Sequence, residues 1–479
     1  MDEFRIERDS LGEVRVPSDK HFGAATQRAL ENFPVSGIAL PRRFIRALGR
    51  VKLAAAKVNK QLNAIEGRMA SAIAEAAQEV TDGKWDAEFV VDVFQTGSGT
   101  STNMNANELI ASRANEILGG SKGDRLPVRP TDDVNMSQSS NDVFPSAIHL
   151  AVLEAADEDL LPSLSGLAAG LEKKAGEFAG VLKTGRTHLQ DAVVMTLGQE
   201  FSGYAAQLRH GISRLETAKH GLLELPIGGT ALGTGINAPP DFGARMCCEL
   251  GRITGAPFRE AANKFEAIGS RDALVYFSGT LKALAVSLFK IASDIRLLAS
   301  GPRTGIGEIH LPNLQPGSSI MPGKINPVAP EMMIQVCAQI IGNDCAVTLG
   351  GMSGNLELNT MMPLIARNVL ESSSLLSSAC RIFDERCVSS GPPIEGEPEN
   401  SEGIRVNLAR CRELLEKSFM GVTALVPKLG YEKSAEIARK AWKTGKTIRE
   451  IVLAEKLMEP LELEKLLNPS SQAGTGKEK

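Results

Sequence analysis

The chain has 479 residues, a formal net charge of −4 and a charged share of 23%. This length is enough for two or three domains with a substantial core. The small net charge gives no reason to expect nucleic acid or an anionic membrane as a partner. Hydrophobic residues make up 43% of the chain but aromatic residues only 4%, so aliphatic side chains must fill the core, which suits closely packed helices.

The N-terminal residues mix acidic and basic side chains without an apolar h-region, so we expect neither a secretory signal nor a transit peptide. We expect no apolar run long enough to span a bilayer, and we expect the protein to be cytoplasmic. Seven scattered cysteines form no CxxC pair, and their odd number argues against a disulfide framework. We therefore expect buried reduced thiols and no zinc site, because the six histidines do not cluster with them.

Residues 1–138 are expected to form an N-terminal domain, which carries a GSGT loop. Its helical patterns are short, and the clearest of them cover residues 51–62 and 70–80. This segment therefore differs from the part of the chain that follows it.

Residues 139–390 carry three long apolar seams and are expected to form a central domain. The seam from 269 to 300 alternates steps of three and four residues, which is typical of a long helix that packs along its whole length. Segments 150–178 and 201–222 are similar, and Pro162 should bend the first of them. One seam alone indicates only a core helix, but three predict an all-α bundle with apolar surface left for a homo-oligomer.

Residues 391–479 are expected to contain a linker, a small helical domain and a disordered tail. Segment 389–403 is rich in Pro, Gly and Glu, as exposed linkers are. Short helices are predicted at 408–415 and 434–442, and the polar residues 468–479 are expected to be disordered.

Two polar loops precede predicted helices. Segment 95–108 reads QTGSGTSTNMNANE and segment 137–150 reads SQSSNDVFPSAIHL, with Pro145 expected in the first turn of the second helix. A glycine-rich or hydroxyl-rich helix start presents free N–H groups that attract an anion. Helix capping alone is an alternative for both, although four polar residues at 139–142 are more than a cap requires.

Two further loops add groups that can move protons or meet charge. His188 lies in a polar stretch, KTGRTHLQDA, and although a lone histidine is more often structural, it can exchange a proton near neutral pH. Residues 317–327 read GSSIMPGKINP, and their spacing excludes a P-loop. Glu331 follows in a helix start, where it also suits the helix dipole. If the four loops meet, their donors fit a small dicarboxylate better than a nucleotide, because no dinucleotide fingerprint is present.

GSSIMPGKINP resembles the GSSxMPxKxNP signature of the fumarase/aspartase superfamily, and the other three loops resemble that family's remaining active-site regions in the same order. Within the superfamily the chain is most similar to class II fumarases, because aspartases usually carry Gln where His188 stands and Ala where Ser98 stands. The resemblance implies an all-α, three-domain chain whose central long-helix bundle forms the core of a homotetramer, with each active site shared by three subunits. It also implies reversible anti hydration of fumarate to L-malate, a step of the tricarboxylic acid cycle, without a metal or organic cofactor.

The resemblance also implies roles for individual residues. Ser318 would take the C3 proton of malate, and His188, paired with Glu331, would handle the proton of the water or hydroxyl at C2. Lys324 and Asn326 would meet the charge of an aci-carboxylate intermediate. The other substrate-binding residues would be Ser98, Gly99, Thr100, Ser139, Ser140, Asn141, Thr187, Ser319 and Ile325.

The chain departs from the family at two places. Many bacterial fumarases have a second dicarboxylate site near an HPND run, where this chain has Arg129-Pro130-Thr131-Asp132. The His and Asn are replaced, which weakens the inference of an accessory site, although Arg129 keeps a charge that can hold a carboxylate. Segment 391–400 resembles an insertion without a catalytic part.

Two other functions stay open at this stage. An aspartate ammonia-lyase, or another fumarate-releasing lyase of the superfamily, would use the same scaffold. A non-catalytic structural protein is the third alternative, as lens crystallins of this superfamily show. The presence of His188, Ser318, Lys324 and Glu331 argues against that last alternative.

Overall fold

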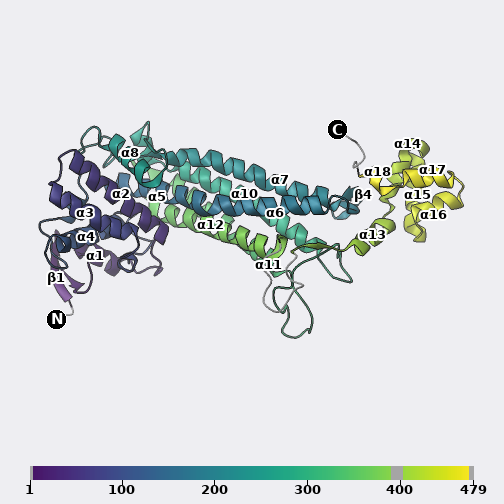
Figure 1. The fold of residues 1–479 in the computed structure, drawn as a ribbon, viewed down its shortest axis with the longest axis horizontal. Coiled ribbons are helices and arrows are strands. Elements are labelled where there is room, and N and C mark those ends of the chain that lie inside the picture. Colours follow the sequence, from purple (N-terminus) through teal and green to yellow (C-terminus); the bar gives the residue numbers. More distant parts are fainter. Residues whose placement is uncertain (1–3, 390–402, 474–479) are drawn as a thin grey trace. The chain divides into compact units, whose positions relative to one another are not determined.

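The computed structural model describes residues 4–389 and 403–473, and it is mainly helical, with strands only in short pairs (Figure 1). This confirms the all-α class. The chain forms two compact units, and the long helices pass from one to the other. The first unit comprises residues 1–162, 213–285 and 337–377, and the second comprises 163–212, 286–336 and 378–479. The domain boundaries at 138 and 390 stay a prediction.

The first unit is built around α2 (Arg42–Gln61), which packs against α3 (Gly67–Thr81), α5 (Ser140–Ala155) and α8 (Phe242–Thr254). Most of its buried residues are apolar, so burial of apolar surface drives this packing. The predicted helices at 51–62 and 70–80 are confirmed, and α2 begins earlier than expected. The remaining elements of the unit are β1 (Phe4–Asp9), β2 (Gly12–Pro17), α1 (Ala24–Asn32), α4 (Thr100–Ile117), β5 (Glu224–Leu225), β6 (Arg259–Glu260), α9 (Lys264–Gly269), β8 (Gly354–Asn355) and β9 (Leu358–Asn359).

Five long helices divide between the units: α6 (Leu161–Glu177), α7 (Leu197–Lys219), α10 (Asp272–Leu298), α11 (Val328–Met352) and α12 (Met362–Phe383). The predicted seam of α10 is confirmed, because all of its eight apolar members are buried. At 27 residues, α10 is about 40 Å long. Within the second unit Arg209 of α7 donates to Glu172 of α6 at 2.8 Å, and the Tyr204 hydroxyl of α7 donates to Asp294 of α10 at 3.1 Å, so α7 contacts both helices (Figure 1).

A π-helical turn lies directly before the helix that carries Pro162, and the bend expected there stays a prediction. Residues Ala156–Leu160 form one π turn between α5 and α6. Proline has no N–H to donate and its ring crowds the preceding turn, so a wider turn just before it relieves the α-helical pattern.

Helices α10 and α11 are long and apolar enough to cross a membrane by length and composition alone. The expectation that no apolar run reaches this length was therefore wrong. In the structure 50% of the apolar window of α10 and 33% of that of α11 is buried. Core helices of globular proteins meet the same criterion, so the finding is weak as a membrane signal.

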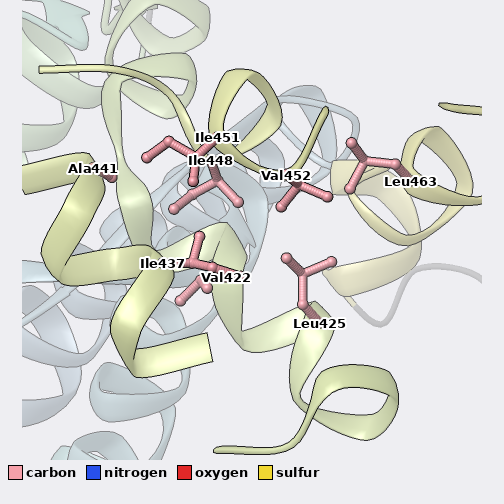
Figure 2. Close-up of a cluster of buried hydrophobic side chains, with 8 residues drawn as sticks. All are labelled: Val422, Leu425, Ile437, Ala441, Ile448, Ile451, Val452 and Leu463. Carbon is pink, nitrogen blue, oxygen red and sulfur yellow. The ribbon is translucent and has the colours of Figure 1, made fainter. Parts of the chain in front are cut away.

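The second unit contains a hairpin of β3 (Leu182–Thr187) and β4 (Gln190–Thr196), and a C-terminal group of helices. Figure 2 shows the apolar core of that group, in which Leu425, Val452 and Leu463 are fully buried. The predicted helices at 408–415 and 434–442 are confirmed. The unit's other elements are β7 (Ile309–His310), β10 (Arg405–Val406), α13 (Leu408–Lys417), α14 (Val426–Leu429), α15 (Tyr431–Thr444), α16 (Ile448–Ala454), α17 (Pro460–Leu466) and α18 (Pro469–Gln472).

Two sequence expectations need correction. The tail was expected to be disordered from residue 468, but Pro469–Gln472 form a short helix capped by Asn468. Proline at the first helical position and an Asn cap make this local start favourable. The cysteines are all free, yet Cys248 and Cys345 are exposed rather than buried. The linker and insertion at 390–402 and residues 474–479 lie outside the described residues.

The C-terminal core gives a first testable prediction. Replacing Leu425 by Ala leaves a cavity among buried side chains, which should lower the free energy of unfolding of this helical group by about 2–5 kcal/mol. A urea titration monitored by amide hydrogen exchange in α15 and α16 measures this loss of free energy of unfolding. Leu461→Ala is the control, because Leu461 is 80% exposed and should change little. An equal effect of both substitutions would contradict the buried core.

Candidate active site

The GSGT turn in the first unit leads directly into α4. Gly99 has φ 74° and is the N-cap of the helix, a left-handed conformation that favours glycine. A Cβ there would collide with the Phe144 ring, and one at Gly97 would collide with the Thr360 carbonyl. The close packing brings Ser98 and Thr100 together, with their hydroxyl oxygens 2.7 Å apart. The predicted turn at the start of a helix is confirmed.

The second polar loop forms the start of α5. Ser139 is the N-cap, and Asp142 completes a capping box. Ser140 is buried, and its hydroxyl accepts from Asn103 Nδ2 of α4 at 3.3 Å. This contact brings the two predicted loops of the first unit together. Pro145, expected in the first turn, instead lies inside the helix.

A buried lysine that the sequence analysis missed lies behind this loop. Lys52 of α2 is fully buried, and its Nζ donates to Asn135 Oδ1 and Gln138 Oε1 at 3.0 Å each. Burial lowers the pKa of Lys52 to about 7, and the charge of Asp142 opposes that shift. The signal in the sequence was a lysine within the apolar run of α2, because a buried cation needs polar partners.

His188 sits at the tip of the β3–β4 hairpin. Thr187 pairs with Gln190, so His188 and Leu189 form a two-residue turn with φ 55° and 59°. Both values are left-handed, as in a type I′ turn, which usually carries Asn and Gly. A non-glycine pair there is strained, and such strain concentrates at functional sites. Among residues 4–389 and 403–473 the exposed His188 imidazole has no hydrogen-bond partner. The sequence had indicated only a polar loop.

A buried carboxylate anchors this hairpin. Glu308 is fully buried and accepts from Arg186 at 2.9 and 3.1 Å, and Lys183 Nζ lies 3.2 Å from it. Lys183 also donates to Glu200 at 2.6 Å. The segment that follows Glu308 leads to the GSSIMPGKINP loop. One ion-pair cluster therefore connects the base of the hairpin to the segment that precedes this loop. No sequence pattern indicated this cluster, because its members are far apart in the chain.

The GSSIMPGKINP loop closes on itself before α11. The Gly317 N–H donates to the Lys324 carbonyl at 2.9 Å, and Asn326 Nδ2 donates to the Gly317 carbonyl at 2.5 Å. The Ser318 hydroxyl accepts from the N–H groups of Met321 and Ile320 at 2.9 and 3.3 Å. The loop thus carries Ser318, Lys324 and Asn326 on one small ring. Ser319 and Ile325 are exposed on the same loop.

Glu331 lies in the first turn of α11, as predicted, and is half-buried. Within the described part of one chain it forms no ion pair with His188. The pairing of His188 with Glu331 therefore stays a prediction. Ser98, Gly99, Thr100, Ser139, Ser140 and Asn141 belong to the first unit, and Thr187, His188, Ser318, Ser319, Lys324, Ile325, Asn326 and Glu331 belong to the second.

The Arg129–Asp132 segment is exposed and forms part of a π-helical turn, Pro130–Val134. Arg129 and Asp132 line an open pocket of about 580 Å³ with Leu126, Pro127 and Asp133. Arg129 Nη1 lies 3.1 Å from Asp132. A carboxylate already occupies this guanidinium, so an anionic ligand would have to compete with it.

No group of three or more His, Cys, Asp or Glu side chains among the described residues is placed to hold a metal ion. What the two units do offer is a set of hydroxyl, amide and ammonium donors, together with one imidazole and one carboxylate. Groups of these types can bind a carboxylate or transfer a proton.

Residues 12–342 match a family model described as Lyase, and residues 422–471 match the model for the Fumarase C C-terminus. These matches define the class of the fold. The chain is 52% identical to a class II fumarate hydratase from Corynebacterium efficiens, over 99% of this chain and 97% of that one. It is 51% identical to one from Ralstonia nicotianae, over 94% and 95% of the two chains.

Solved structures agree. A recombinant class II fumarase from Schistosoma mansoni superposes with a TM-score of 0.94 at 38% identity, over 99% of this chain and 100% of that one. A fumarate lyase:delta crystallin structure from Brucella melitensis has a TM-score of 0.92 at 47% identity, over 98% and 99%. The chain belongs to the class II fumarate hydratase family.

The anchor of the hairpin gives a second testable prediction. Glu308→Ala would leave Arg186 without its partner in a buried site, which should cost about 3–5 kcal/mol of the free energy of unfolding. Glu172→Ala is the matched control, because Glu172 makes an equally short two-bond contact with Arg209 at the surface and should cost below about 1 kcal/mol. Similar losses in denaturant titrations of both variants would show that burial adds nothing.

Proposed function

We propose that this chain is a fumarate hydratase, which catalyses the reversible, stereospecific anti hydration of fumarate to L-malate. The GSSIMPGKINP loop is the observation that carries the proposal, because it places a hydroxyl, an ammonium and an amide on one closed ring. Two relatives of the chain are named class II fumarate hydratase, and a similar solved structure is named class II fumarase. A step in the tricarboxylic acid cycle and a cytoplasmic location are consistent with this reaction and are part of the proposal.

In the malate direction, Ser318 would remove the C3 proton. A serine hydroxyl is a weak base and must be activated. The two backbone N–H groups that reach the Ser318 oxygen, from Ile320 and Met321, would stabilise its alkoxide form as an oxyanion hole does. The nearby cation of Lys324 on the same loop would lower the free energy of that anion further.

Loss of the C3 proton leaves a carbanion whose charge spreads onto the adjacent carboxylate. Lys324 and Asn326 would meet that charge. Asn326 uses Nδ2 to close the loop, but an amide has two N–H groups, so one donor remains for substrate oxygen. The Lys324 ammonium is exposed, so it can approach a carboxylate of the substrate.

At C2, His188 would protonate the departing hydroxyl so that water leaves, and Glu331 would orient the imidazole. The C3 proton and the C2 hydroxyl leave on opposite faces, which gives anti geometry. Ser98, Gly99, Thr100, Ser139, Ser140, Asn141, Thr187, Ser319 and Ile325 would hold the two carboxylates and fix the reacting carbons.

The proposal includes a homotetramer with active sites shared by three subunits. Helix α10 exposes Tyr276 and Val286, and α11 exposes Leu349 and Met352. Large apolar side chains on the outer faces of long helices mark surfaces that associate. Association would also allow His188 of one subunit to meet Glu331 of another.

The activity test compares two substrates. Incubation with L-malate should release fumarate, read by its ultraviolet absorbance, and incubation with L-aspartate should not. Ser318→Ala and His188→Asn should each lower kcat for malate dehydration by about 10²–10⁴. His210→Asn is the control for His188, because His210 is an exposed histidine of α7. Losses below about tenfold in both variants would reject the acid and base assignments, and release from aspartate alone would favour the ammonia-lyase.

The assembly test places a charge on an apolar surface. Leu349→Lys on α11 should prevent burial of this face, dissociate the tetramer and remove activity, because the site would lose residues from neighbouring subunits. Light scattering and malate dehydration should change together. Leu11→Lys, at a 79% exposed position in the β1–β2 turn, should change neither. A fully active monomer would contradict sharing of the site.

A further inference from the structure

The start of α5 is tied to a second, glycine-rich segment by one buried carboxylate. Asp142 is fully buried, and its Oδ1 accepts from the Ser139 N–H at 2.9 Å. Its Oδ2 accepts from the N–H groups of Gly228 and Thr230 at 3.0 and 2.9 Å. A helix cap needs only the first of these bonds. The other two cross to the segment between β5 and α8, which we call the 228–237 loop.

The 228–237 loop is held in an unusual conformation. Thr230 has φ 54°, which is an outlier for a β-branched residue and is strained. Thr230 is buried, and within the described residues its hydroxyl has no hydrogen-bond partner. Such a conformation persists only when its surroundings over-determine it, and the Asp142 carboxylate supplies that restraint.

A second bond connects the loop to a residue assigned to the substrate. Asn141 Nδ2 donates to the Ala231 carbonyl at 2.7 Å. The loop therefore fixes the orientation of the Asn141 amide, and the Asp142 carboxylate fixes the position of the loop. From Ala231 to Asn237 the loop reaches the surface, with Leu232, Thr234 and Asn237 exposed.

Burial raises the pKa of Asp142 to about 7, while the three backbone donors and Lys52 lower it. A protonated carboxyl would turn a donor toward other donors. The geometry of three N–H groups around two oxygens therefore favours the ionised form. Lys52 supplies the opposite charge, and its ammonium is held by Asn135 and Gln138.

We propose that Asp142 is a positioning residue for the substrate site, which fixes Ser139, Ser140 and Asn141 against the 228–237 loop and so makes that loop a further wall of the site. Asp142 does not touch substrate. It acts through the Asn141 amide and through the backbone of Thr230. This inference rests on the proposed function, because it concerns the dicarboxylate held at the start of α5.

Asp142→Asn tests the proposal at constant size. The amide keeps one oxygen but turns an NH₂ group toward N–H donors, so the tie between α5 and the loop is lost. We expect KM for L-malate and fumarate to rise at least tenfold, while kcat falls by less and its pH profile is unchanged, since His188 and Ser318 remain. Asp241→Asn is the matched control, because Asp241 is exposed and stands at the far end of the same segment, before α8. It should leave KM unchanged.

Thr230→Gly provides a second variant if Asp142→Asn folds poorly. Glycine keeps the N–H that Asp142 binds and relieves the left-handed strain, so the folded protein should be at least as stable in thermal melts. We expect the loosened loop to raise KM without a matching fall in kcat. A folded Asp142→Asn or Thr230→Gly protein with parental KM would overturn the inference. A parental protein that does not form fumarate from malate would instead overturn the proposed function.

Discussion

Burial of α5 along its whole length is the constraint on which the two polar loops of the first unit depend. Every residue from Asp142 to Ala155 is buried, so the helix can neither slide nor rotate without exposing apolar surface or leaving polar groups unpaired. Its first turn is therefore fixed, and with it the N–H groups and side chains of Ser139, Ser140 and Asn141. The same packing holds Gly99 against Phe144, which fixes the start of α4. A dianion that binds here meets donors that do not have to reorganise.

Buried charge is the second feature of this fold, and three of the buried charged side chains adjoin polar segments. Lys52 and Asp142 lie under the start of α5, and Glu308 lies under the hairpin that carries His188. Replacing such groups by apolar ones of similar volume often costs nothing or stabilises a protein, so stability alone does not explain them. In both places the charge restrains a segment with left-handed non-glycine residues, Thr230 in one and His188 in the other. The charges maintain strained conformations that aliphatic packing, being non-directional, could not specify.

The sequence predicted what depends on local pattern. The seam of α10, the helix starts at Thr100 and Ser140, and the place of Glu331 follow from periodicity, glycine and capping chemistry, and the structure has them. The β3–β4 hairpin was missed because its turn, His188-Leu189, lacks the Asn-Gly residues that a type I′ turn favours. Lys183, Arg186 and Glu308 were missed for another reason: nothing in the chain links positions more than a hundred residues apart. The bonds between Asp142 and the 228–237 loop join residues 86 and 88 positions apart, and no local pattern indicates them either.

The GSSIMPGKINP loop holds its donors in a closed ring, but water still reaches part of that ring. Lys324 and Ile325 are exposed, and at a separation of 4 Å two unit charges in water attract by only about 1 kcal/mol, against about 4 kcal/mol at an effective dielectric constant of 20. The charge of an aci-carboxylate is therefore stabilised much more strongly after water has left. Glycines 317 and 323 keep the loop able to adjust, and Gly317 is also required where Lys324 and Asn326 pass close to its backbone. Binding of a dianion would supply the counter-charge for Lys324 and would favour a closed loop that excludes water. The ligand would therefore help to form the low-dielectric site in which its own charge is stabilised.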